Sequence, residues 1–139
     1  MIDSSRVFEL LDIHMGGPFR WEKEDCFTGA ANVFRGFTGI DLADEVRGQY
    51  QDEEGARVIL GDYGGSLSVF LAVQAMRKDL KRSEDLSTAP VGAIGVSPRD
   101  CAIGLDGRCI CIHLTPGIWA TKSIRGYALS AQAETYWHV

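Results

Sequence analysis

The pattern of apolar residues changes after Pro90, and this change constrains the fold more than any other feature of the sequence. From residue 1 to about residue 86, apolar side chains recur at the three- and four-residue spacing of amphipathic helices. After Pro90 the apolar runs become short and alternate with polar residues, which is typical of strands. Helices followed by a small antiparallel sheet predict an α+β fold, in one domain spanning residues 1–139.

The helical half contains five predicted helices, most of them bounded by a capping residue and a glycine. They are Ser4 or Ser5 to Ile13, Cys26 to Gly36 or Gly39, Asp41 to Val46, Glu53 to Leu60, and Leu67 to Leu80. In the last of these we expect Met76 to lie in the core. The basic run Arg77–Arg82 is interpreted as the solvated end of that helix.

The clearest strand signal is a predicted hairpin over residues 101–114, with Asp106-Gly107 as a two-residue turn. Such a turn pairs Leu105 with Arg108, and the register then places Asp100 opposite His113. Cross-strand partners share a face of the sheet and interact. The sequence therefore predicts an imidazole–carboxylate pair, with a surface pair at the end of a hairpin as the alternative. Further strands are expected at 91–96, 118–120, 124–129 and 136–139.

Cys26 is the candidate nucleophile, because Asp25 before it is a good helix N-cap. A thiol in the first turn of a helix lies at its positive end, which favours the reactive thiolate. A pair formed by His113 and Asp100 is the arrangement that activates a thiol, with His113 as the base and Asp100 orienting it. A buried cysteine that packs as a small hydrophobic residue is the alternative for Cys26. His14 and His138 are expected to have structural roles.

Composition argues against several classes of function. A net charge of −5 and an isoelectric point near 5.1, without a cluster of lysine and arginine, argue against a nucleic-acid-binding surface. No apolar run has the length of a membrane span, and no signal peptide opens the chain. The four cysteines are therefore expected to be free thiols. A metal site built from Cys101, Cys109, Cys111 and His113 is a further alternative, although zinc usually favours closer C-x-x-C pairs. We expect no metal and no cofactor.

Several motifs, taken in order, resemble a known group of proteins. Trp21 and a charged run precede Asp25-Cys26, and Thr38-Gly39-Ile40-Asp41 is followed by Arg47-Gly48-Gln49-Tyr50. Gly64-Gly65-Ser66-Leu67, the predicted hairpin and the closing strand Tyr136-Trp137-His138-Val139 complete the pattern. It resembles the NlpC/P60 cysteine peptidases, which have a papain-like fold. It is more similar still to a DUF6950-like branch found in phage tails, and the likeness spans nearly the whole chain.

This resemblance implies a function and partners. It implies a tail-tip structural component of a tailed phage or gene-transfer particle. Such a protein would be made in the host cytoplasm and located in the virion tail. Its partners would be other tail proteins, such as hub, distal tail or fibre proteins. The alternative is an active cysteine peptidase or amidase that cleaves peptidoglycan peptides during cell entry. In NlpC/P60 enzymes the catalytic histidine begins a strand that reads His-Val-Gly-Ile. The best match to that strand begins at Asp100, which implies either that the histidine and its partner have exchanged strands, with His113 on the next strand, or that the site is degenerate.

Overall fold

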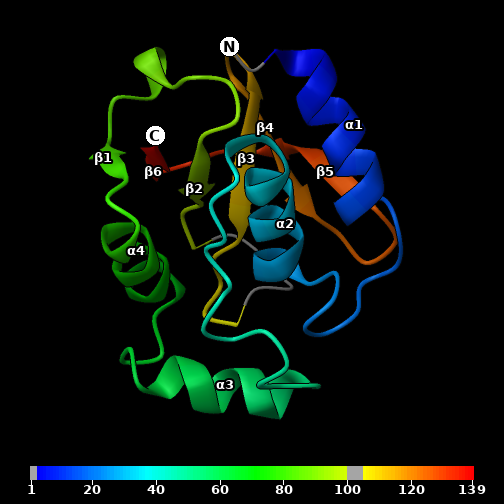
Figure 1. Ribbon diagram of the computed structural model, residues 1–139, viewed down its shortest axis with the longest axis vertical. Coiled ribbons are helices and arrows are strands. Elements are labelled where there is room, and N and C mark those ends of the chain that lie inside the picture. The colour runs from blue at the N-terminus through cyan, green and yellow to red at the C-terminus, as the bar shows by residue number, and fades with distance from the viewer. Residues whose placement is uncertain (1–2, 100–104) are drawn as a thin grey trace.

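The α-helices come first and the strands second in the computed structural model, which describes residues 3–99 and 105–139. Figure 1 shows the arrangement. The described helices are α1 (Ser4–Met15), α2 (Cys26–Thr38), α3 (Glu53–Gly61), α4 (Leu67–Arg77) and the short 3-10 helix η1 (Leu86–Thr88). The strands are β1 (Lys81–Ser83), β2 (Ile94–Val96), β3 (Ile110–Thr115), β4 (Ile118–Lys122), β5 (Tyr127–Ala131) and β6 (Thr135–His138). The predicted α+β class is confirmed.

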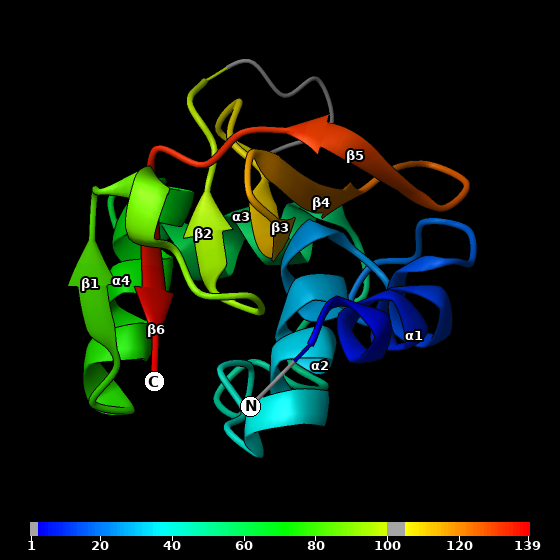
Figure 2. The same cartoon turned by 90° about the horizontal axis from the view of Figure 1, so that it is seen from above.

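The strands of the described residues form one antiparallel sheet in the order β1-β6-β2-β3-β4-β5. The last strand of the sequence, β6, thus lies inside the sheet, between β1 and β2. To reach that position the chain leaves the outer strand β5 and crosses over one face of the sheet, as Figure 2 shows. The strands β1 and β5 form the two edges.

Local capping explains where the helices begin and end. The side chains of Asp3, Asp25, Asp52 and Ser66 accept backbone amide hydrogen bonds at the starts of the four α-helices. Gly39, with φ of 79°, ends α2 in the left-handed conformation that glycine adopts without strain.

Three sequence predictions about this half are wrong. Residues 42–48 form turns rather than a helix. Helix α4 ends at Arg77, and Lys81 and Arg82 of the predicted helix end lie in strand β1. The side chain of Met76 is 70% exposed and does not belong to the core. The apolar stripe that predicted this helix is therefore longer than the helix itself.

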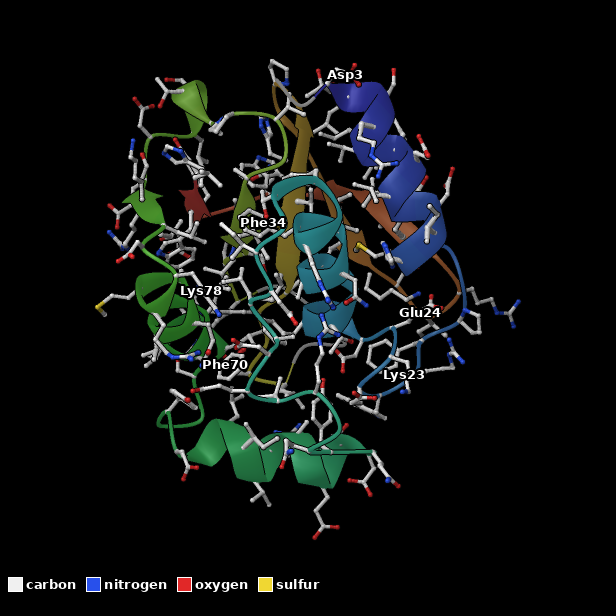
Figure 3. All side chains as sticks on the ribbon, viewed as in Figure 1. Asp3, Lys23, Glu24, Phe34, Phe70 and Lys78 are labelled. Atoms are coloured by element: carbon white, nitrogen blue, oxygen red, sulfur yellow. The ribbon has the colours of Figure 1, made fainter. Side chains whose placement is uncertain are left out.

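The sheet separates two hydrophobic clusters. The larger one lies between the helices and the sheet, and it includes Phe34 of α2, Phe70 of α4 and the strand residues Ile110 and Ile112. Figure 3 labels Phe34 and Phe70. The smaller cluster lies on the opposite face and consists of Ala93, Cys111, Trp119, Ala133 and Tyr136. Within the described residues, no helix is long and apolar enough to cross a membrane.

Candidate functional site

Cys26 is the first residue of α2, as predicted, and Asp25 is the N-cap of that helix. Asp25 Oδ1 accepts hydrogen bonds from the amides of Phe27 (2.9 Å) and Thr28 (2.7 Å). The Thr28 hydroxyl in turn accepts from the amide of Asp25 at 3.1 Å. This reciprocal arrangement is a capping box, which satisfies amides that the first turn leaves free.

The Cys26 side chain is closed off from solvent. Only 4% of the residue is exposed, and the backbone amides that reach its sulfur are its own and that of Ile110, at the start of β3. Burial, reinforced by the charge of Asp25, raises the pKa of the thiol from 9.0 to about 12. The opposing effects, which include the hydrogen bond from Ile110, are smaller. Cys26 therefore holds a neutral thiol at physiological pH, in the state of a packed residue.

Asp25 is also engaged through its second oxygen. Oδ2 accepts a hydrogen bond from the amide of Glu22 at 2.9 Å and a short one from the hydroxyl of Tyr50. Asp25 is 2% exposed, so these four donors hold a buried carboxylate in one orientation. Burial and the adjacent carboxylate raise the pKa of Tyr50, which keeps its hydroxyl protonated as a donor.

The segment from Thr38 to Tyr50 forms a strap that returns along α2 from its end to its beginning (Figure 1). At the far end, the Thr38 hydroxyl donates to the carbonyl of Phe34 at 2.7 Å and accepts from the amide of Ile40 at 3.0 Å. At the near end, the amide of Gly48 donates to the Glu22 carboxylate at 2.7 Å, and Tyr50 reaches Asp25.

An ion-pair network fixes the middle of the strap. Arg47 binds Asp41 through two nitrogens, at 2.9 and 2.8 Å, and also donates to the Asn32 amide oxygen on α2 at 2.7 Å. This bond to Arg47 holds the pKa of Asp41 below its usual value. Lys78, after α4, donates to Asp44 at 2.5 Å, which joins the strap to a second helix; Figure 3 labels this lysine. The Thr-Gly-x-Asp and Arg-Gly-x-Tyr motifs thus hold the Cys26 helix in place.

His113 lies on the other face of the sheet from Cys26. Successive residues of a strand point to opposite faces, and Ile110 and Ile112 of β3 point toward the helices. The His113 ring packs on Trp119 with centroids 4.6 Å apart, and its Nδ1 forms a hydrogen bond with the carbonyl of Pro90 at 3.0 Å. The structure therefore does not bring the predicted nucleophile and base together. The hydrogen bond between His113 and Pro90 instead holds the segment before β2 against the sheet.

The predicted hairpin register is also wrong. Strand β3 pairs with β2, so that Ile112 lies opposite Ile94 and the amide of His113 donates to the carbonyl of Ala93 at 2.9 Å. On its other side β3 pairs with β4, where Trp119 is the partner of His113. Asp100 and Cys101, which the predicted hairpin contained, lie outside the described residues.

The cysteines differ from expectation at one position. Cys26 and Cys111 are free and buried, whereas Cys109 is disulfide-bonded. The predicted free thiol is therefore wrong for Cys109. Within residues 3–99 and 105–139, no group of three or more histidine, cysteine or acidic side chains is placed to hold a metal ion.

A buried cation that the sequence analysis missed lies near the start of α2. The Nζ atom of Lys122 donates to three backbone carbonyls, those of Gly17 (2.5 Å), Ser123 (2.9 Å) and Gly126 (2.8 Å). It joins the loop before α2 to the β4–β5 turn. No local sequence pattern predicts a buried lysine of this kind, because its three partners are backbone oxygens.

The other histidines have local roles: burial lowers the pKa of His14, and His138 Nδ1 contacts the Val139 carbonyl oxygen at 2.9 Å.

An apolar pocket of about 390 Å³ lies at the opposite end of α2 from Cys26. Its lining comes from the end of that helix, the segment before β2 and the end of β6, namely Phe34, Phe37, Thr38, residues 90–93, His138 and Val139. It contains none of the predicted catalytic residues, so it does not serve as a cleft for a thiol nucleophile at Cys26.

Comparison with known proteins gives one match. No curated protein and no solved structure matches the chain. A family model described as a domain of unknown function, DUF6950, matches residues 3–139. The match covers both the strap motifs and the capped Cys26 helix, and the chain therefore belongs to the DUF6950 family.

Proposed function

We propose that this domain is a structural component of the tail tip of a tailed phage or phage-like particle, built on an NlpC/P60-like fold whose catalytic site has degenerated. The observation that carries the proposal is the separation of Cys26 and His113 by the sheet, together with the burial of the Cys26 thiol. A thiol hydrolase needs a base within reach of its nucleophile. The tail location and the tail-protein partners come from the resemblance of the motifs.

The strand packed beside Cys26 supports the same conclusion. The residue of this strand that reaches the thiol is Ile110, at the start of β3. Its contact with the sulfur is a backbone amide, which can neither take nor give a proton in catalysis. Among the described residues, none that contacts the thiol can act as a base, which supports a degenerate site.

The alternative function is an active cysteine peptidase or amidase acting on peptidoglycan peptides. One observation favours it, which is the position of Cys26 in the first turn of a capped helix that packs on a sheet. Activity would require the thiol to become exposed and a histidine to reach it from the helix side of the sheet. Neither condition holds for the described residues.

Complementation separates the two functions. Particles produced without this gene should lack normal tail tips, and the wild-type gene should restore them. The Cys26→Ala variant should restore infectivity as fully as wild type, because it removes only a small buried side chain, at a cost of about 1 kcal/mol. As a matched control, Cys111→Ala alters the other buried free thiol, which lies on the opposite face of the sheet. Normal particles that fail to infect only with Cys26→Ala would indicate the peptidase instead.

A further inference from the structure

The apolar pocket at the end of α2 has a wall that the fold holds in place. This wall is the segment before β2, residues 90–93. The amide of Gly92 donates to the carbonyl of His113 at 2.8 Å, and the amide of His113 donates to the carbonyl of Ala93 at 2.9 Å. The Nδ1 atom of His113 forms a further hydrogen bond with the Pro90 carbonyl at 3.0 Å. On the pocket side the ring of Phe37 packs against this wall, since a Cβ atom on Gly92 would lie 2.5 Å from Phe37 Cζ. The pocket is therefore formed before any ligand arrives.

The hydrogen-bonding groups of the lining are largely engaged within the chain. The Thr38 hydroxyl both donates and accepts a hydrogen bond, and Nδ1 of His138 contacts the Val139 carbonyl oxygen. The amides of Gly92 and Ala93 donate to backbone carbonyls. A charged or strongly polar ligand would lose its hydration in the pocket without gaining partners, at a cost of about 1–3 kcal/mol for each polar group. The lining therefore selects a neutral, apolar occupant.

The rings of Phe34 and Phe37 make this lining aromatic. Their centroids lie 5.5 Å apart and their planes are inclined at 68°, which is an edge-to-face contact. A third ring extends such a cluster favourably when its centroid lies about 4.5–7 Å from a neighbour. A dry cavity of about 150 Å³ holds one benzene ring. A pocket of about 390 Å³ therefore has room for a one- or two-ring group such as a phenyl or an indole.

The pocket is open on one side. Pro90 is exposed and Val139 is 68% exposed, although both contribute to the lining. A free small ligand is usually enclosed over about 70–90% of its surface. An open mouth instead suits a ring whose attachment remains outside the pocket.

We propose that the pocket receives an aromatic side chain, a tryptophan or a phenylalanine, of a partner protein. The ring enters between the end of α2 and the wall of residues 90–93, and the backbone of the partner stays outside. Aromatic anchors that fill a pocket supply most of the binding energy of many interfaces. The site lies at the other end of α2 from Cys26, and the proposal does not depend on the tail location.

Titration with a blocked tripeptide, acetyl-Gly-Trp-Gly-amide, tests the pocket. The NMR signals of the backbone amides of Phe37, Thr38 and residues 91–93 should shift in a saturable manner, with a Kd of about 1 mM or lower. The signals of α3 should not shift, and the same peptide with lysine in place of tryptophan should have no effect. Free indole distinguishes the source of the ring. Binding of indole without binding of the tryptophan peptide would assign the pocket to a free small molecule and overturn the proposal.

Two variants with matched controls locate the binding site. Val91→Phe places a ring of the chain itself in the pocket and should weaken peptide binding by roughly tenfold or more. Val58→Phe makes the same change at a residue of α3 that is 71% exposed, and it should leave binding unchanged. Phe37→Leu keeps an apolar side chain but removes the ring, and should weaken binding by about two- to tenfold. Phe8→Leu, at a ring of α1 that is 40% exposed, should have no effect.

The absence of saturable shifts in the wild-type chain, or equal affinities in each variant and its control, would overturn the proposal. None of these results would alter the assignment of Cys26, which rests on the complementation experiment.

Discussion

At the scale of single residues, the environment of Cys26 decides its chemistry. The N-terminus of a helix favours a thiolate, and Asp25 provides the cap that was expected to create this position. The carboxylate of that cap and the removal of water both disfavour the charged form, and together they outweigh the helix. A capped cysteine is therefore a nucleophile only where solvent or a cation reaches its sulfur.

The reactivity of Cys26 follows from this balance. A pKa of about 12 in place of 9.0 lowers the thiolate fraction near neutral pH by roughly a thousandfold. Labelling of the folded protein with a disulfide reagent should accordingly be slow, should accelerate as pH rises, and should become fast on unfolding in urea. The Cys26→Ala variant identifies the contribution of this thiol among the free cysteines. Rapid labelling of folded protein at neutral pH would show that the thiol is accessible and activated.

A second prediction at this scale concerns the contribution of the buried Lys122 to stability. Replacing it with methionine preserves the aliphatic stem but leaves the carbonyls of Gly17, Ser123 and Gly126 without their donor. We expect Lys122→Met to lower the free energy of unfolding by about 2–4 kcal/mol, measured by urea titration. Lys81→Met, at an exposed edge position, should change it by less than about 0.5 kcal/mol. Equal effects of the two substitutions would show that the hydrogen bonds from Lys122 to the three carbonyls contribute nothing to stability.

At the scale of elements, the strap shows that local sequence signals predict a helix, whereas contacts between residues far apart in the sequence cannot be predicted from such signals. The capping residues of α2 and the glycine that ends it act within a few residues, and for that reason the sequence predicted this helix closely. The partners that Arg47, Gly48 and Tyr50 find outside the strap lie on or before α2, up to 26 residues away, and no periodic pattern reveals them. Turns replace the predicted helix after Asp41 because its carboxylate binds Arg47 and the amide of Ala43.

The stability of the strap is testable at Arg47. Arg47→Met removes the bonds to Asp41 and Asn32 and should lower the free energy of unfolding by about 2–3 kcal/mol. Arg6→Met, which removes an exposed pair with Glu9, should cost less than about 0.5 kcal/mol.

Acid titration tests the same bond. The folded-state pKa of Asp41 is lowered, so its contribution is present above the usual carboxyl pKa and is lost as pH falls through the folded value. The loss of stability over that acidic range should be smaller in Arg47→Met than in wild type. An identical acid dependence would show that this ion pair does not hold the strap.

The hairpin shows why the site could not be predicted as fully as the helices. Asp106-Gly107 has the composition of a two-residue turn, but the Asp106 carboxylate accepts from the amides of Leu67 (2.9 Å) and Arg108 (3.1 Å). A contact with the first residue of α4 is tertiary and invisible to turn statistics. The face of His113 could have been inferred, since the larger apolar residues Ile110 and Ile112 alternate with it and a covering helix packs on them.

At the scale of the whole molecule, the order of strands ties the last residues to the core. Strand β6 lies between β1 and β2, so among the described strands β6 is the one that joins residues 81–83 to the sheet. Its two aromatic residues serve opposite faces: Trp137 belongs to the cluster beneath the helices and Tyr136 to the smaller cluster. Tyr136 also donates to the carbonyl of Asp85 at 2.8 Å, which holds the segment that covers the second face.

A chain ending at Glu134 should therefore fail to fold, although only five residues are removed. The loss of two buried aromatic side chains, at about 3–5 kcal/mol each, approaches the entire stability of a domain, about 5–15 kcal/mol. Circular dichroism should show that helical signal is lost together with strand signal, because Trp137 packs in the core that the helices share. Removal of Val139 alone, which is exposed, should leave the urea transition unchanged. If the chain ending at Glu134 kept a cooperative transition with native helix content, the helices would form a unit independent of the sheet, and the sheet could not be what holds the Cys26 helix in its buried position.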